Sequence, residues 1–237
     1  MWPMASDPKI HVGTSGFSYV EWQPAFYPEG LKKAEMLSFY AGQLSSVELN
    51  NTFYRMPSEK HVQAWSEQVP DTFRFAIKAT RRMTWSNKLV DCGELLDYLF
   101  KMLVPLGDKL GCVFYQLPKF VRCDLDVLRA FLDEQPKGIQ TAFEFVHDSW
   151  GDPAVLQLLH AHGATQVLSD KDDEAVPELA VGAPWLYLRL RRSAYSDAEL
   201  LGWRNRIKKS GASTAFVFFK HEDSCAGPAL ARRFLDL

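Results

Sequence analysis

Ionisable and amide side chains stand at the ends of several short apolar segments of this sequence. Glu48 and Asn50 close the segment SVELN, Lys78 lies near the end of FRFAIKA, and Glu144 lies within TAFEFV. Two carboxylates that face one pocket can divide the roles of general acid and general base when their environments separate their pKa values. A lysine beside them can hold an anion or balance their charge. These residue types therefore indicate acid–base chemistry, provided that the fold brings the segments together.

The elements that would position these residues follow a regular alternation. Eight short segments rich in β-branched and aromatic residues are predicted strands, at 10–15, 46–50, 73–79, 110–116, 141–146, 165–170, 185–191 and 215–221. Helical patterns occur between them, at 31–44, 59–68, 92–106, 125–134, from Asp152-Pro153 onward, 197–208 and from Pro228 to the C-terminus, while 171–184 has a weak pattern.

Eight strands alternating with about eight helices predict an α/β fold, a single (β/α)8 TIM-type barrel over residues 1–237. An open doubly wound sheet is the main alternative. That fold usually has a glycine-rich phosphate loop after its first strand, and GTSG at 13–16 is shorter than either nucleotide-binding fingerprint. Side chains able to cap helices support the helix starts, at Ser58, Asp124, Asp152 and in the capping box Ser196-x-x-Glu199.

Alternate residues of a barrel strand face the axis, and enzymes with this fold place their chemistry at the carboxyl ends of the strands. If the apolar residues of each strand face the helices, a polar set faces inward. Its members are Ser15, Glu48, Asn50, Lys78, Gln116, Glu144, Asp170, Tyr187, Arg189, Arg191, Lys220 and His221. We expect Glu48, Glu144, Lys78 and Asp170 to be catalytic. The alternative is structural, because these charges can also neutralise one another in a buried network.

Aromatic side chains in the predicted loops add a second kind of group. They are Phe17, Tyr19, Trp22, Phe53, Tyr54, Trp85 and Trp150. Such rings can pack in the core or form a lid, and several together can stack on a sugar or a base. The residues expected to bind substrate are Ser15, Tyr19, Trp22, Asn50, Tyr54, Gln116, His147, Trp150, Arg189, Arg191 and Lys220.

Composition limits the classes of partner. The formal net charge of −2 gives no general attraction to nucleic acid or to an anionic membrane. No apolar run is long enough for a membrane helix, and the N-terminal MWPMASDPK does not resemble a secretory signal. We therefore expect a cytoplasmic protein. The polar set at the strand ends leads us to expect a small molecule as its ligand. The four cysteines form no CxxC pair, which predicts structural thiols, and neither a cofactor nor an oligomeric state is indicated.

Several segments resemble the YecE-like family, a domain-of-unknown-function family numbered 72. They are GTSGFSYVEW (13–22), FYP (26–28), SVELNNTFYRMP (46–57), FRFAIKATRRMTW (73–85), YQLP (115–118), EFVHDSW (144–150) and LYLRL (186–190). The resemblance covers nearly the whole chain and implies a TIM-type barrel, but it implies no activity. The positions that it marks as site residues are Ser15, Tyr19, Trp22, Glu48, Asn50, Thr52, Tyr54, Lys78, Gln116, Glu144, His147, Trp150, Asp170 and Arg189.

The chain departs from the family pattern at three places. Val146 stands where an arginine usually precedes the histidine, and Arg191-Arg192 stands where the family often has His-Gly. After the last strand, Lys220-His221 begins a segment where an Asn-rich turn is common. These changes alter the charge of the predicted site, and Arg191 can replace a missing basic group.

Four functions fit these observations. Glu48 and Glu144 suit glycoside or related hydrolysis, although barrel glycosidases usually carry their carboxylates on strands four and seven. The basic residues Lys78, Arg189, Arg191 and Lys220 suit an anionic small molecule. Glu144, His147 and Asp170 are residue types that can bind a metal ion for catalysis, but their spacing in the sequence matches no known metal-binding motif. The last alternative is a binding module without catalysis, including a nucleic-acid-binding one that uses Arg81, Arg82 and Trp85.

Overall fold

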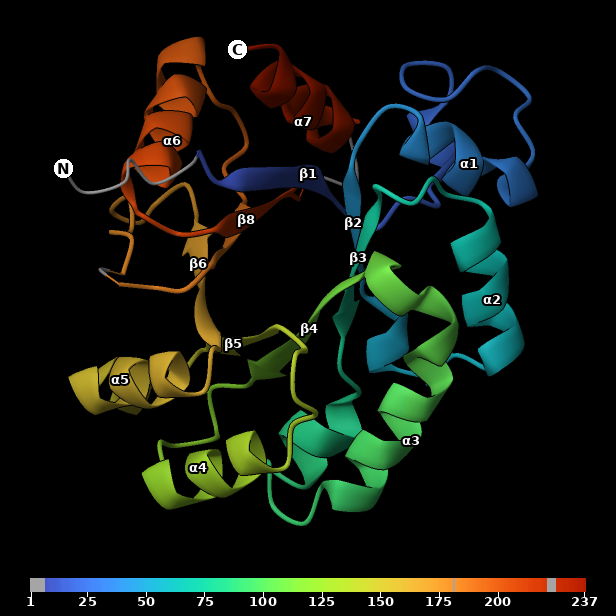
Figure 1. Ribbon diagram of the computed structural model, residues 1–237. Coiled ribbons are helices and arrows are strands. Elements are labelled where there is room, and N and C mark those ends of the chain that lie inside the picture. Colours follow the sequence, from blue (N-terminus) through green and yellow to red (C-terminus); the bar gives the residue numbers. More distant parts are fainter. Residues whose placement is uncertain (1–6, 181, 221–224) are drawn as a thin grey trace, which may run out of the picture. The chain divides into compact units, whose positions relative to one another are not determined.

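A computed structural model describes residues 7–180, 182–220 and 225–237 of the chain. Eight strands follow one another around a closed barrel in chain order, as Figure 1 shows, and the predicted fold class is confirmed. The strands are β1 (Lys9–Ser15), β2 (Ser46–Leu49), β3 (Arg74–Lys78), β4 (Leu110–Leu117), β5 (Thr141–Phe145), β6 (Thr165–Asp170), β7 (Leu186–Leu190) and β8 (Thr214–Phe219). Each predicted strand boundary lies within about two residues of the observed one. Residues 1–6 and His221, which entered two of the sequence predictions, lie outside the described residues.

Helices connect the strands. They are α1 (Met36–Ala41), α2 (Glu59–Glu67), α3 (Gly93–Leu103), α4 (Leu125–Asp133), α5 (Pro153–Ala161), α6 (Asp197–Lys209) and α7 (Ala226–Asp236). Short 3-10 turns occur at Val20–Trp22, Lys33–Glu35, Asn51–Phe53, Val104–Lys109 and Asp148–Gly151, and a π-helical turn at Arg82–Ser86. Between β6 and β7, residues 171–180 and 182–185 contain no helix, as the weak pattern there indicated.

Side-chain caps start three helices as predicted. Asp124 accepts hydrogen bonds from two backbone N–H groups of α4, and Asp152 accepts one from Ala154 at the start of α5. Ser196 and Glu199 form the predicted capping box of α6. The predicted cap at Ser58 is wrong, because its hydroxyl is 2.7 Å from His61 Nδ1 and bonds no backbone N–H of α2.

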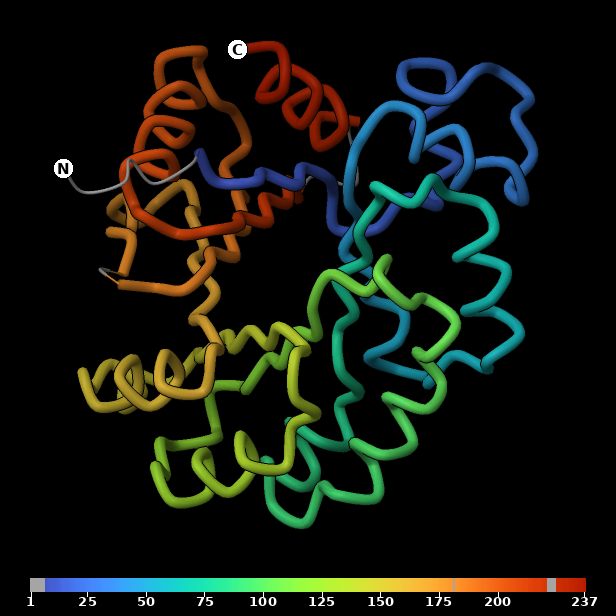
Figure 2. Tube along the Cα trace, viewed as in Figure 1, coloured from blue at the N-terminus to red at the C-terminus, as the bar shows by residue number. Residues whose placement is uncertain are grey.

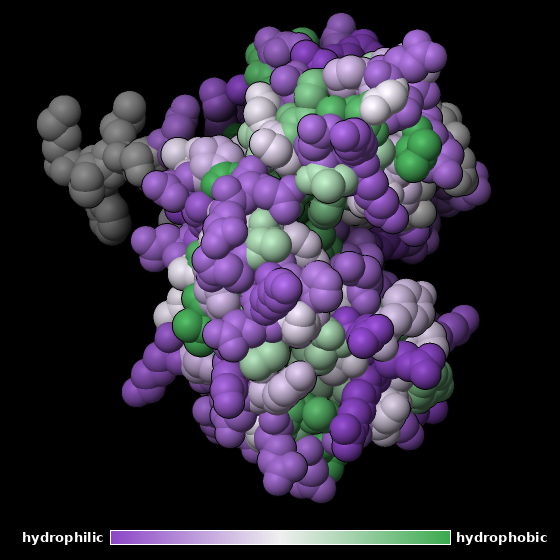
Figure 3. All heavy atoms as spheres, turned by 90° about the vertical axis from the view of Figure 1, so that its right-hand side faces the viewer, coloured by the Kyte–Doolittle hydropathy of each residue, from purple (hydrophilic) through white to green (hydrophobic). Residues whose placement is uncertain are grey.

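Contacts divide the chain into two compact units. The first unit comprises residues 1–47 and 167–237, and the second comprises residues 48–166. In the second unit, α2 lies beside α3 and α4 beside α5, which can be followed along the trace in Figure 2. The face of the molecule seen in Figure 3 is mainly hydrophilic, with hydrophobic residues scattered over it.

In the second unit, aromatic packing identifies which strand face meets the helices. Tyr115 of β4 and Phe143 of β5 stack with ring centroids 5.1 Å apart, and both rings contact Phe131 of α4. Gln116 and Glu144 alternate with these residues and lie abreast in the strand register. Their side chains therefore point away from the helices, to the inner face of the sheet.

The first unit follows the same rule. Phe219 of β8 contacts Phe234 of α7, so Phe219 and the residues abreast of it face the helices. The alternate residues form the inner face, where Tyr187 lies within ring contact of Phe216 and Phe218, and His11 stacks on Phe216 at 5.0 Å. This inner face is therefore filled by packed rings, as expected for a barrel whose centre is a core and not a pore.

A close backbone approach joins β1 to β2 within the first unit. A Cβ atom at Gly13 would lie 1.8 Å from the carbonyl oxygen of Ser46, which only glycine can accommodate. The Tyr40 hydroxyl, at the end of α1, accepts a hydrogen bond from the Thr14 N–H and donates one to Ser46 O. The GTSG segment thus serves strand packing at its first glycine.

Candidate functional site

Five polar side chains gather at the carboxyl ends of β2–β5 in the second unit. This strand-end cluster consists of Glu48, Asn50, Lys78, Gln116 and Glu144. Lys78 Nζ donates to Gln116 Oε1 at 2.7 Å, and Gln116 Nε2 donates to Glu144 Oε2 at 2.5 Å. Asn50 Nδ2 donates to Glu48 Oε1 at 2.9 Å. The structure therefore shows two hydrogen-bonded groups at these strand ends, Asn50 with Glu48 and Gln116 with both Lys78 and Glu144.

The cluster lies in a low-dielectric setting. Glu48 is fully buried, and 7% of Glu144 and 9% of Lys78 are exposed. The Lys78 ammonium lies over the Phe53 ring, 4.4 Å from its centroid, in a cation–π contact. Burial raises the pKa of the Cys112 thiol well above its usual range, and the nearby Glu48 carboxylate adds to the effect. Charges held in such surroundings interact more strongly than they would in water.

Gln116 orients its two ionisable neighbours. An ammonium can only donate, so the amide oxygen faces Lys78 and the amide N–H faces Glu144, where it needs an acceptor. The Thr52 hydroxyl links the backbones at the ends of β2 and β3, since it lies 3.0 Å from Leu49 O and 2.6 Å from Lys78 O. One oxygen of the Glu144 carboxylate is held by the Gln116 amide. A positioned carboxylate of this kind can take or give a proton at a bound substrate.

In the first unit, Ser15 ends β1 on the inner face. Its Oγ is buried and has no hydrogen-bond partner among the described residues. Tyr19 donates from its hydroxyl to the Ser15 carbonyl oxygen at 3.0 Å, and its ring lies 4.7 Å from that of Trp22. Trp22 is 1% exposed and packs on Phe26 and Tyr27, which makes it part of the core.

The predicted inward orientation of Asp170 is wrong. The register places Ser169 abreast of Arg189 and Asp170 abreast of Leu190, so Asp170 lies on the helix-facing side of β6. Its carboxylate accepts hydrogen bonds from Arg192 Nε at 2.7 Å, Tyr195 OH at 3.0 Å and Trp203 Nε1 at 3.2 Å. The error arose because Val167 was taken to face outward, whereas it lies abreast of the inward Tyr187.

The basic residues after β7 and β8 have different surroundings. Arg189 is 3% exposed and lies on the inner face beside Phe218 in the register. Arg191 is half-buried, and its backbone N–H donates to Asp170 O at 2.8 Å. Lys220 follows the end of β8 and is exposed.

The loop residues predicted to bind substrate divide into buried and exposed ones. His147 Nδ1 accepts from the Ser149 N–H at 3.0 Å, which caps a 3-10 turn. Trp150 is buried, stacks on Phe145 at 4.2 Å, and donates from Nε1 to Val121 O. Tyr54, by contrast, is 76% exposed.

Two features of the described residues concern the predicted partner classes. The described part of the chain contains no group of three or more His, Cys, Asp or Glu residues arranged to hold a metal ion. None of its helices is long and apolar enough to cross a membrane. All four cysteines are free thiols.

Three features of the sites were missed from the sequence. Ser169, not Asp170, is the inward residue at the end of β6, and the mixed sequence of that strand has no clean alternation to reveal it. The stacked His11 lies on the inner face of β1, a strand whose alternation is ambiguous. The role of Gln116 as the link between Lys78 and Glu144 depends on distances between strands, which no local pattern contains.

Comparisons with known proteins agree with this fold. A DUF72 family protein from Thermotoga maritima superposes with a TM-score of 0.79 at 24% identity, covering 96% of this chain and 97% of that one. A DUF72 family protein from Enterococcus faecalis gives 0.75 at 20% identity, covering 98% and 99%. At these identities the likeness shows the fold alone.

Sequence relatives and a family model are more specific. The UPF0759 protein YecE of Escherichia coli O157:H7 is 28% identical over 167 residues, which are 68% of this chain and 59% of that protein. The UPF0759 protein YunF of Bacillus subtilis is 26% identical over 193 residues, 76% and 65% of the two chains. The chain thus spans about three fifths of the length of these relatives. The model of the family described as protein of unknown function DUF72 matches residues 11–237. The chain therefore belongs to the DUF72 family.

Proposed function

We propose that this chain is an enzyme that performs acid–base chemistry on a small anionic or sugar-like substrate at its strand-end cluster. The observation that supports it most is the hydrogen-bonded series from Lys78 through Gln116 to Glu144. Apolar residues of the same volume would be at least as stable at these buried positions. Burying ionisable groups at these positions costs stability. A chemical role for them therefore explains their presence better than a purely structural role does.

Each member of the cluster has a part in this proposal. Glu144 and Glu48 are the acid–base pair, and Lys78 carries the positive charge that holds an anionic group of the substrate. Gln116 and Asn50 are positioning residues, because each donates a hydrogen bond to one of the carboxylates. Arg189 and Arg191 remain predicted anion-binding residues. Asp170 has no part in the chemistry, since its carboxylate faces α6.

A substrate screen tests the proposal. Phosphorylated sugars, glycosides and nucleotides would be offered with and without a divalent metal, and both thermal shift and product formation would be followed. We expect Glu144→Gln and Glu48→Gln to lower the rate on any substrate found by at least about a hundredfold while leaving the melting curve close to that of the parent. Glu94→Gln, an exposed change on α3, is the matched control.

Two outcomes count against the proposal. Turnover by Glu144→Gln and Glu48→Gln at the parental rate would exclude the acid–base pair. A ligand that raises the melting temperature of the parent without being converted would favour the runner-up, a binding protein without catalysis.

A further inference from the structure

Three exposed aromatic side chains form a continuous row on the second unit. This aromatic row consists of Tyr54, Trp85 and Phe120, which are 76%, 41% and 57% exposed. Buried Phe53 links the first two, with ring centroids 5.2 Å from Tyr54 and 5.6 Å from Trp85. Trp85 meets Phe120 at 5.8 Å. Isolated exposed apolar residues are common, but a contiguous row of rings indicates a binding surface.

The loops that carry the row are strongly cationic. The loops 50–58, 79–92 and 118–124 lead from β2, β3 and β4 to the next helices. They contain six Lys or Arg against two acidic residues, Asp91 and Asp124, although the whole chain has a net charge of −2. The six are Arg55, Arg81, Arg82, Lys88, Lys119 and Arg122. All are exposed, and none forms an ion pair within the described residues. Their charge is therefore available to a polyanion.

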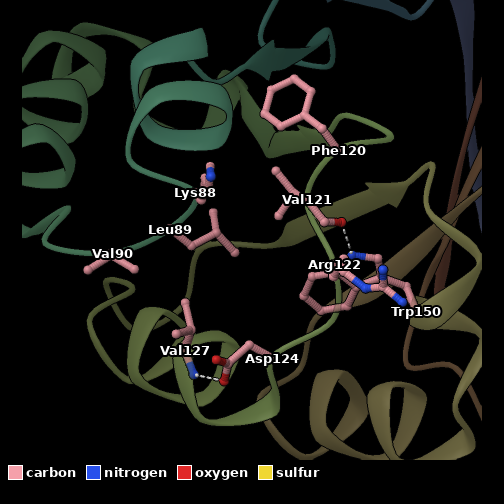
Figure 4. A pocket seen from close by; sticks show the side chains of 9 residues that line it. All are labelled: Lys88, Leu89, Val90, Phe120, Val121, Arg122, Asp124, Val127 and Trp150. Atoms are coloured by element: carbon pink, nitrogen blue, oxygen red, sulfur yellow. Dashed lines mark hydrogen bonds between the residues drawn. The ribbon is translucent and has the colours of Figure 1, made fainter.

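A pocket of about 320 Å³ adjoins the row at Phe120. Figure 4 shows its lining, with Arg122 beside the Trp150 ring and Leu89 and Val127 on the other side. Trp150 is fixed there by its hydrogen bond to Val121 O at 2.9 Å. Leu89, with φ at 70°, is held in the left-handed region, a strained conformation for a branched residue that often marks ligand-binding loops. The volume suits one planar ring system.

We propose that the aromatic row and the adjoining pocket bind single-stranded nucleic acid. Successive bases would stack on Tyr54, Trp85 and Phe120, and the phosphates would contact the six loop cations. One base at the end of the bound segment would enter the pocket beside Trp150. A duplex hides the faces of its bases and so cannot stack them on the aromatic row. A neutral sugar carries no charge that the six cations could bind. Neither ligand therefore accounts for both the rings and the cations. This binding is independent of the acid–base chemistry proposed above.

Fluorescence anisotropy with a labelled 12-nucleotide oligo-dT tests the proposal on the full chain. We expect binding at 50 mM salt that weakens as salt rises, with a slope of log K against log salt near −0.7 for each phosphate contacted, or about −2 to −4 for three to six contacts. Trp85→Ala should weaken binding about tenfold or more, because base–aromatic stacking is lost. Tyr98→Ala, at a 48% exposed aromatic on α3 outside the row, is the control and should have no effect.

A paired charge experiment separates stacking from charge. Arg81→Gln with Arg82→Gln should reduce the salt slope by about 1 to 1.5, whereas Lys208→Gln with Lys209→Gln on α6 should leave it unchanged. Circular dichroism would confirm that each exposed substitution leaves the fold intact.

Four results would overturn the proposal. Three of them are an absence of salt-dependent binding, equal affinity for a duplex of the same length, and equal affinity of the parent and Trp85→Ala. The fourth is competition by inorganic polyphosphate as strong as that by oligo-dT, which would show binding by charge alone. Glu144→Gln should bind oligo-dT like the parent, so that loss of catalysis and loss of nucleic-acid binding are distinguished.

Discussion

Replacing Asp170 with alanine tests whether this carboxylate stabilises the first unit. Asp170 is 1% exposed and accepts hydrogen bonds from Arg192, Tyr195 and Trp203. Alanine would remove the acceptor for all three donors at once. Tyr195 and Trp203 are 4% and 3% exposed, so water cannot readily take the place of the carboxylate for either of them.

The magnitude follows from those contacts. Removing one partner of a buried ion pair costs about 3–5 kcal/mol. The Arg192 side chain is 19% exposed and can recover some hydration, which places the expected loss near the lower end, about 3–4 kcal/mol. That is a large share of the roughly 5–15 kcal/mol that typically stabilises a protein. For a chain of this size it corresponds to a fall in Tm of about 6–16 °C.

Urea denaturation followed by circular dichroism would measure the free energy of unfolding of the parent, Asp170→Ala, Arg192→Ala and the double variant. The double variant should be less destabilised than the sum of the single ones, because the two side chains interact directly. Asp170→Asn, which keeps one oxygen acceptor, should lie between the parent and Asp170→Ala. A loss below about 1 kcal/mol for Asp170→Ala would refute this reasoning and return Asp170 to the set of functional residues.

Three further predictions concern the scaffold. Gly13→Ala should destabilise the protein by at least about 2 kcal/mol in urea denaturation, because its Cβ would lie 1.8 Å from a carbonyl oxygen of β2; a fully stable variant would show that the strands can separate there. Ser196→Ala should cost about 1 kcal/mol through loss of the capping box, whereas Ser58→Ala, which removes no backbone cap, should cost less than about 0.5 kcal/mol, and equal losses would contradict the assignment. Burial, with nearby Glu134 and Asp91 adding to it, raises the pKa of Cys92 from 9.0 to about 11, so the unfolded thiol loses its proton first and stability should fall as the pH rises from about 9 to 11. In Cys92→Ala this fall should be smaller, and an unchanged pH profile would count against the shift.

The positions of the strands and of most helices were predictable from local pattern. Segments such as FRFAIKA combine branched and aromatic residues that prefer a pleated, buried surface, and cap residues such as Asp124 satisfy the free N–H groups of a helix. Both effects act over a few residues. Strand alternation likewise placed Glu48, Lys78, Gln116 and Glu144 together, because in each of those strands a clear apolar series identifies the helix-facing side.

The same reasoning failed at β6, where the sequence TQVLSD has apolar side chains on both faces. There the pairing of β6 with β7 decides which residues face inward, because a shift of one residue moves every side chain to the other face. In the observed pairing Ser169 lies on the inner face and Asp170 faces the helices. The residues that donate hydrogen bonds to Asp170 are 22 to 33 residues away in the sequence, namely Arg192, Tyr195 and Trp203.

The sequence by itself determined the order of the elements, their approximate ends and the residue types available at each strand end, since all of these follow from local propensity and periodicity. The tertiary structure alone decided which polar groups bond to one another and which exposed rings adjoin. Gln116 reaches Lys78 and Glu144 across 38 and 28 residues of chain, and Trp85 reaches Phe120 from a different loop. Such contacts depend on the pairing of strands in space, and that pairing is fixed by the cooperative packing of the whole chain and not by any one segment.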